Sequence, residues 1–351
     1  MQYDDDPEFN NYIDSLYGDI TIEEFSRPAS IVLFTMDEEA YLSSYNQYIS
    51  QQKENLINNI VIYSFPAPIA FYFESSLHRF DNNNHRLNLL RSTWESLIFL
   101  LYAIIFGEII DSSINISSIR VFNNSIRFNK SGLLSEKLGY KLEVIEKILE
   151  FNQEQEVGLM VGDVIPIPVI DKLRDLSQDR NSLMHSQATN EIEAEDTFEQ
   201  LLPKVEDIFF DLRKLEYLSL IRYGATTSSS ISKLKFLKLD GYSLKWRNYE
   251  KEVSSDFIKK NFDHLKENSL FCEFEEYKKM ICLSPFACAL LQNQFHHVAW
   301  YKQVVNSEEK YEFELVADAP PEKSLDHKER KKLFIPSNVF SLSIETLKTL
   351  L

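Results

Sequence analysis

Glycine is scarce in this chain, with eight glycines among 351 residues. Gly107, Gly132, Gly158 and Gly162 are too scattered to form a phosphate-binding loop of the Walker or dinucleotide type. We therefore expect neither an ATPase nor a dinucleotide-dependent enzyme, and no cofactor. Phe (25) and Tyr (17) are abundant, and together with the low glycine content this favours a folded, helix-rich protein.

Long apolar runs and disulfide-type cysteines are also missing. The longest apolar run, residues 97–106, is too short to span a bilayer, so no membrane partner is expected. The first residues are acidic and do not have the form of a signal peptide. Cys272, Cys282 and Cys288 are odd in number and lack metal-ligand spacing, although His296 and His297 follow them. We expect buried free thiols, no metal site, and a cytoplasmic protein.

Positive charge is in deficit, because 37 Lys and Arg face 54 Asp and Glu and the net charge is −17. Such a chain repels nucleic acid at long range, but a local basic cleft is not excluded. Two basic groups stand out. The first contains Arg79, Arg86 and Arg91, and the second contains Lys323, Lys328, Arg330, Lys331 and Lys332. Either could line such a cleft, but we favour the alternative that each is a solvated surface that balances nearby acids.

The stretch Arg180-Asn181-Ser182-Leu183-Met184-His185 carries the chemistry of most interest. Arginine presents a planar set of donors that fits phosphate, and histidine can give or take a proton near neutral pH. Asn181 and His185 share a helix face, whereas Arg180 and His185 lie roughly 140° apart around an ideal helix. The two side chains therefore meet at one phosphate if Arg180 swings round, if the helix is irregular, or across a symmetric dimer. We expect the helix to run over 169–184, so that its C-terminus raises the pKa of His185.

The longest predicted helix covers residues 85–110, with apolar residues at three- and four-residue steps. Arg91 and Glu95 lie four residues apart on it. Glu95, or Arg91, could reach a cleft beside Arg180 and His185. The alternative, slightly favoured, is an ordinary ion pair within the helix.

The rest of the pattern predicts an α+β protein, in which a helical bundle is followed by a smaller strand-rich domain. We expect an acidic, mixed region at 1–63, the bundle at 64–223 with an insertion at about 111–165, and a strand-rich domain at 231–351. Residues 31–34 are interpreted as a short strand, and residues 196–223 as one helix. Five strands are expected in the last domain, the final two forming a hairpin: 234–239, 270–274, 280–283, 297–301 and 311–316.

The motif and its surroundings resemble the HEPN superfamily of small helical bundles. The signature of that family is an Arg, often followed by Asn, with a His four to six intervening residues later, as in Arg180-Asn181 to His185. The leucine-rich approach, Leu173 to Leu176, is also similar to the family. Family members often carry a polar residue on an earlier helix that faces the motif, and this implies Glu95, with Arg91 as the second candidate. The resemblance covers roughly residues 64–223.

The resemblance implies a metal-independent endoribonuclease that forms a homodimer and acts in toxin or abortive-infection defence against phage. His185 would be the general acid or base, Arg180 would stabilise the phosphorane, and Asn181 would orient the cleft. A protein or small-molecule trigger would bind residues 231–351. The alternative is a non-catalytic HEPN module for dimerisation or partner binding. A third possibility is a phosphate-handling site at His296 or His297. A shared role for these two is not expected, because neighbours on a strand point to opposite faces.

Overall fold

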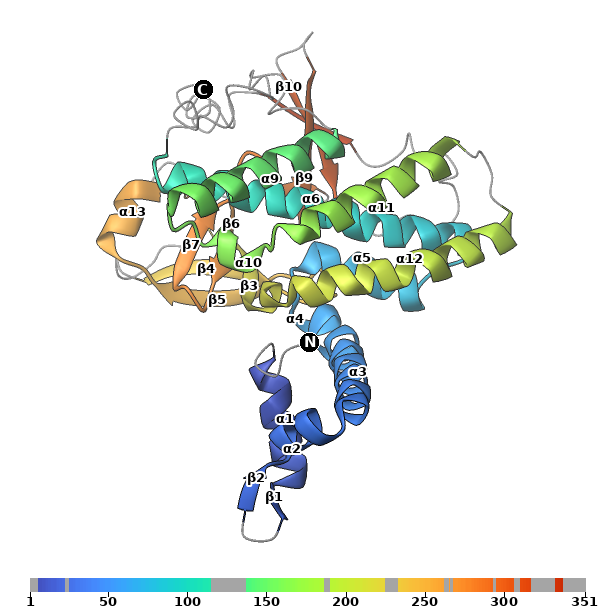
Figure 1. Cartoon of the computed structure of the whole chain (residues 1–351). Coiled ribbons are helices and arrows are strands. Elements are labelled where there is room, and N and C mark those ends of the chain that lie inside the picture. The colour runs from blue at the N-terminus through green and yellow to red at the C-terminus, as the bar shows by residue number, and fades with distance from the viewer. Residues whose placement is uncertain are drawn as a thin grey trace. The chain divides into compact units, whose positions relative to one another are not determined.

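The protein, seen in a computed structural model, is α+β, as the sequence predicts (Figure 1). The structure describes residues 6–22, 25–114, 137–185, 190–224, 233–261, 265, 268–292, 295–305, 310–316 and 332–336. The chain divides into two compact units, Met1–Asn58 and Asn59–Leu351, which are considered separately.

The first unit is a small helical body with its own core. Its described elements are α1 (Pro7–Tyr17), β1 (Asp19–Ile22), β2 (Phe25–Pro28), α2 (Ala29–Met36) and α3 (Glu38–Asn55). Asp6 and Asp37 cap α1 and α3 by accepting backbone N–H groups. The core contains Phe9, Ile13, Ala29, Tyr41 and Tyr48. The strand predicted at 31–34 is wrong, because these residues form the middle of helix α2; a short apolar run does not by itself separate strand from helix.

The second unit contains the helical bundle. Its helices are η2 (a π-helical turn, Leu56–Val61, which includes the division between the units), α4 (Ile62–Ser64), α5 (Ala67–His78), α6 (Asn83–Asp111), α9 (Leu138–Gln155), α10 (Val161–Val164), α11 (Pro168–His185), α12 (Glu191–Asp211), η4 (Arg213–Tyr217) and α13 (Ser255–Asn261). Helix α6 is central, since α5, α9, α11 and α12 all pack on it (Figure 1). Helix α9 lies in the segment predicted as an insertion, yet it packs on α6 and α11 as part of the bundle.

Helix α6 is buried over nearly its whole length. By length and composition alone, α6 could cross a membrane, and it is the one helix among the described residues that could. However, 94% of its most apolar stretch is buried within the protein. The core helix of a globular protein passes the same test, so this feature is weak evidence for a membrane span.

The strands form two antiparallel sheets in the same unit. The five-stranded sheet has the order β5-β4-β3-β6-β7, and the four-stranded sheet has the order β11-β10-β9-β8. Their bounds are β3 (Leu218–Tyr223), β4 (Lys233–Leu239), β5 (Arg247–Glu252), β6 (Leu270–Phe274), β7 (Lys279–Cys282), β8 (Ala287–Gln292), β9 (Phe295–Val305), β10 (Lys310–Leu315) and β11 (Lys332–Pro336). All five predicted strands are present, and β9 and β10 pair as the expected antiparallel neighbours.

The single helix predicted over 196–223 is wrong. Helix α12 ends at Asp211, and Leu218–Tyr223 is strand β3, the middle strand of the five-stranded sheet. The last residues of the segment predicted as bundle, 218–223, thus belong to the sheet. Bundle and sheets form one compact unit, which the predicted boundary at 223–231 does not divide.

Helix α6 meets this sheet closely at Gly107. A Cβ atom there would lie 2.5 Å from the backbone oxygen of Cys282 and 2.6 Å from the Ile281 side chain, so only glycine fits. The neighbouring Glu108 is fully buried and accepts hydrogen bonds from Met160 N and Val161 N, both at 2.9 Å. Its carboxylate also pairs with Lys279 Nζ of β7 at 2.6 Å. Glu108 therefore joins three parts of the fold, α6, α10 and β7.

Candidate functional site

The Arg180–His185 motif occupies the last two turns of α11, and His185 is the final helical residue. This confirms the predicted helix and its end near His185. The side chains of residues 179–185 lie outside the described part of the structure. The position of the motif is therefore given by the backbone of α11 and by the contacts of α11 with neighbouring helices.

Helix α12 contacts both α11 and α6, so positions along these two helices can be compared through their contacts with α12. Lys172 of α11 pairs with Asp211 of α12 at 2.6 Å, and these two helices run antiparallel. Arg180, eight residues after Lys172, therefore lies level with Pro203, eight residues before Asp211. On the other side of α12, the Arg86 guanidinium of α6 lies 3.6 Å from the ring centre of Phe198.

Helices α6 and α12 run parallel, because Asn83 N at the start of α6 bonds Glu191 at the start of α12 (2.7 Å). Arg91, five residues after Arg86, is therefore also level with Pro203 and so with Arg180. By the same count His185, thirteen residues after Lys172, is level with Phe198, thirteen residues before Asp211. His185 is therefore level with Arg86, which contacts Phe198. All α-helices rise about 1.5 Å per residue, so the count is good to about one turn.

Part of α6 at this level is polar and incompletely buried. Between Leu87 and Ile109 every residue of α6 is buried except Asn88 and Ser92. His85, Asn88, Ser92 and Glu95 follow one another at steps of three and four residues, so they share one face of the helix. We call this set the α6 polar face.

Arg91 and Glu95 lie within this region as an ion pair. Arg91 Nε is 3.4 Å from Glu95 Oε1, and the side chains are 9% and 6% exposed. The predicted i,i+4 pair is thus present, although it is buried rather than on the surface. The level count brings Arg91 beside the motif-bearing turns of α11 and leaves Glu95 one turn further along.

His85 is a residue that the sequence reasoning did not single out. Its Nδ1 accepts a hydrogen bond from the backbone N–H of Asp81 (3.2 Å), and the Asp81 carboxylate lies 3.4 Å from the same atom. Its Nε2 is shielded from solvent and has no hydrogen-bond partner among the described residues. By the level count, within its precision of about one turn, His85 lies near the height of His185. The useful signal, an unpaired ring nitrogen, exists only in three dimensions.

The basic group Arg79, Arg86 and Arg91 does not form a free cationic patch. Arg79 pairs with Glu74 at 3.1 Å, Arg86 with Glu199 at 3.2 Å, and Arg91 with Glu95. The arginines therefore balance acids, as the sequence suggested, but the expected solvated surface is wrong for Arg91, which is buried. The second basic group lies outside the described residues, apart from the backbone of Lys332 in β11.

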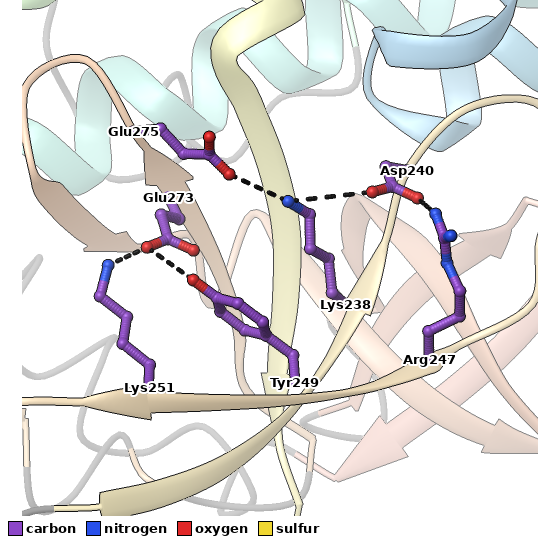
Figure 2. Close-up of polar contacts among 7 residues, drawn as sticks. All are labelled: Lys238, Asp240, Arg247, Tyr249, Lys251, Glu273 and Glu275. Carbon is purple, nitrogen blue, oxygen red and sulfur yellow. Dashed lines mark hydrogen bonds and ion pairs between the residues drawn. The ribbon is translucent and has the colours of Figure 1, made fainter.

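A second polar cluster lies on one face of the five-stranded sheet (Figure 2). Glu273 of β6, only 2% exposed, pairs with Lys251 and accepts a hydrogen bond from the Tyr249 hydroxyl (3.2 Å). Its Oε2 is buried and has no hydrogen-bond partner among the described residues. Burial lowers the pKa of Lys251 and raises the pKa of Tyr249. Lys251 and Tyr249 belong to β5, which β4 and β3 separate from β6.

Three strand spacings amount to about 14 Å in a flat sheet, too far for this contact, so the sheet curls around the cluster. Towards the outside, Lys238 contacts Glu275 (3.0 Å) and Asp240 (3.8 Å), and Arg247 also pairs with Asp240. The three cations balance three carboxylates, so the cluster has little net charge.

The remaining sequence candidates lie on strands of the two sheets. His296 and His297 are adjacent on β9 and pair with exposed Leu291 and buried Leu290, which places them on opposite faces of the sheet. Cys272, Cys282 and Cys288 are free thiols. In the part of the chain that the structure describes, no group of three or more His, Cys, Asp or Glu could hold a metal ion.

Comparisons of the chain with protein-family models, curated proteins and solved structures found no match. The interpretation of the site therefore depends on its own chemistry.

Proposed function

We propose that the protein is a metal-independent endoribonuclease of the HEPN type. Two copies of the motif would form an Arg/His cleft in a homodimer. The observation that carries the proposal is the position of the motif, in the final turns of α11 and level with the α6 polar face. The proposal takes a motif in the last turns of its helix to be more accessible to a substrate than one in the middle of the bundle.

The proposed reaction is transfer of a phosphodiester to the neighbouring ribose hydroxyl. The RNA 2′-oxygen attacks phosphorus, the bond from phosphorus to the 5′-oxygen breaks, and a 2′,3′-cyclic phosphate forms. His185 acts as general base at the 2′-hydroxyl or general acid at the leaving 5′-oxygen. Arg180 stabilises the added negative charge on the phosphorane, and Asn181 orients the cleft. Glu95, paired with Arg91, supports the cleft from α6.

The distribution of charge supports an RNA substrate in the second unit. Residues 1–58 contain twelve acidic and two basic residues, a net charge of −10. The other 293 residues therefore carry only −7 of the total of −17. The body that holds the motif repels RNA much less than the whole chain does.

We further propose a cytoplasmic, latent effector of anti-phage defence. Residues 231–351 would receive a protein or small-molecule trigger, and the cluster around Glu273, whose Oε2 is buried without a hydrogen-bond partner among the described residues, is a candidate place for it. Latency fits a chain with strong negative charge, because such a chain binds RNA weakly until a cleft is formed.

The test is induced expression of the wild type, Arg180→Ala and His185→Ala, with growth and total-RNA integrity as readouts. Arg174→Ala is the matched control, since Arg174 is on the same helix but pairs with Glu146 at 2.9 Å and with Asp171. We expect growth arrest and discrete RNA cuts from the wild type and Arg174→Ala once a phage trigger is present, and neither from the motif variants. Equal behaviour of all four folded proteins, in the presence of a trigger, would favour the non-catalytic HEPN module instead.

A further inference from the structure

Helix α2 of the first unit is apolar on every side, although only part of it is buried. Its sequence, Ala-Ser-Ile-Val-Leu-Phe-Thr-Met, contains no charged residue. A helix of this kind normally lies inside a protein, with other elements against all of its faces. In α2 only Ala29 and Ser30 are buried, and the Met36 side chain is 73% exposed. Part of this apolar helix is therefore left uncovered by the described residues.

The uncovered side of α2 is opposite the side that packs on the core. Leu33 and Phe34 pack against the core of the first unit. At about 100° per residue, Ile31, Val32 and Met36 lie on the other side of the helix. Ile31 and Val32 are half-buried, and neither belongs to that core. We call Ile31, Val32 and Met36 the α2 outer face.

Exposed apolar side chains are concentrated in this unit. Of the nine large hydrophobic side chains that are exposed in the described part of the chain, four belong to the first unit, which holds 58 of the 351 residues. Leu16 and Tyr17 are two of them, and they lie near the start of α2, because Ala29 N bonds the Gly18 oxygen at 3.1 Å. Grouped exposed apolar surface is typical of a protein-interaction site.

The charge beside the α2 outer face indicates the kind of partner. Asp37, Glu38 and Glu39 follow Met36 directly and are exposed, and no ion pair joins any of the three to a described residue. The first unit carries a net charge of −10. A second copy of this unit, RNA or an anionic membrane would all be repelled by that charge, whereas a basic partner would be attracted.

We propose that the α2 outer face docks a basic amphipathic helix of a partner protein. The apolar side of that helix covers Ile31, Val32 and Met36, and its Lys and Arg side chains face Glu38 and Glu39. A helix fits because the outer face is one stripe about 12 Å long, the length of an eight-residue helix. The inference is independent of the proposed ribonuclease, since the motif belongs to the second unit.

The experiment measures binding of a labelled synthetic peptide to the full-length chain by fluorescence anisotropy. The peptide has about 18 residues, only Leu and Lys, with the leucines at helical spacing so that they form one face. A control peptide has the same composition in an order that gives no apolar face. We expect the control to bind about tenfold or more weakly, because its charge is attracted but its leucines do not cover α2.

One pair of variants tests the apolar contact. Val32→Gln/Met36→Gln removes apolar surface, leaves the charge unchanged and keeps a residue that favours helix. We expect it to bind the peptide about tenfold or more weakly than the wild type. Met36→Gln alone changes a largely exposed side chain and should weaken binding about threefold or more. The matched control is Ile192→Gln, which removes an apolar side chain, 72% exposed, from the second unit and should bind like the wild type.

A second pair of variants tests the charge. Glu38→Gln/Glu39→Gln should bind about two- to fivefold more weakly at low salt, with a smaller difference at high salt, because exposed charges are screened. The matched control, Glu154→Gln/Glu156→Gln, neutralises two exposed carboxylates near the end of α9 and should bind like the wild type. Thermal unfolding of each variant shows whether it is folded.

Three results would overturn the inference. The first is no binding of the amphipathic peptide by the wild type. The second is equal binding by the wild type and a folded Val32→Gln/Met36→Gln. The third is a wild-type dimer, measured by light scattering, that becomes a monomer in the same variant, because a second copy would then occupy the face.

Discussion

Arg91 and Glu95 form an ion pair of 3.4 Å on the central helix of the bundle, with less than a tenth of either side chain exposed. Both ions have lost most of their water, and a buried pair depends on both partners being present. Together with Glu108, this pair places buried charge on a largely apolar helix, and by the residue count it lies level with the end of α11.

Breaking this pair from one side should destabilise the protein strongly. We expect Glu95→Ala to lower the free energy of unfolding by about 3–5 kcal/mol, because it removes one member of a buried ion pair. The double variant Arg91→Met/Glu95→Leu should recover most of that loss. Urea denaturation measures both. A loss under about 1 kcal/mol for Glu95→Ala would show that the pair is not buried in solution.

Glu108 should be the most sensitive acidic residue outside the site. Its fully buried carboxylate bonds Met160 N, Val161 N and Lys279. We expect Glu108→Ala to cost about 3–5 kcal/mol of stability, whereas Glu275→Ala, which breaks the exposed pair with Lys238, should cost under about 1 kcal/mol. Comparable losses in the two variants on urea denaturation would contradict the packing of α6 on β7.

The free thiols should be unreactive in the folded protein. Burial raises the pKa of Cys282 to about 12 and also raises the pKa of Cys272 and Cys288. Thiolates are the reactive form, so we expect no rapid reaction with a thiol reagent at pH 8 and three reactive thiols after unfolding, the number in the sequence. Fast modification of any thiol in the native state would show an exposed cysteine.

The same thiols should make the fold sensitive to alkali. Their folded-state pKa values lie above the unfolded value of about 9, so above that pH the folded chain binds more protons than the unfolded chain. Stability is then fully present below about pH 9 and falls as the pH rises. Tyr102, whose pKa burial also raises, adds to the fall above about pH 10. Urea midpoints at pH 8 and pH 10 measure the effect, and a triple Cys→Ala variant should show a shallower fall.

The cluster around Glu273 gives a fifth prediction. Lys251→Ala leaves the Glu273 carboxylate, 2% exposed, with only the Tyr249 hydroxyl as a described donor. We expect a loss of about 3 kcal/mol or more. Lys251→Ala/Glu273→Leu should be more stable than Lys251→Ala alone, because the buried charge is gone. Urea denaturation of the single and double variants decides, and equal stabilities would show that Glu273 is hydrated.

Apolar periodicity predicts α6 and α11 from the sequence, whereas α12 is predicted with the wrong end and α9 lies in the segment expected to be an insertion. Regular apolar spacing and the Asn82 cap place α6, and the proline before Val169 places the start of α11. Strand β3 was missed because Leu215 and Leu218 continue the apolar stripe of α12, so the change from helix to strand leaves no local mark. The strand expected at 31–34 failed for the related reason that four apolar residues fit either structure.

The polar parts of the site were harder to predict. Arg91 and Glu95 were found because their spacing is local, but their burial depends on helices packed around α6. His85 and Glu108 gave no local signal. In the sequence, His85 is an ordinary residue at the start of a helix, and Glu108 is a polar residue at the end of an apolar run. Their roles depend on partners that are close in space: Asp81 and the unpaired Nε2 for His85, and α10 and β7 for Glu108.

The measurement that tests the central claim most directly is cleavage of a defined RNA by the purified chain in EDTA, with and without extract from phage-infected cells. The wild type and Arg174→Ala should give fragments that end in a 2′,3′-cyclic phosphate, and a single 2′-deoxy substitution should block the cut at its own position. Arg180→Ala and His185→Ala, shown to be folded, should give no cut. Fragments of the same kind from either motif variant, or no cleavage by the wild type under any of these conditions, would contradict the account.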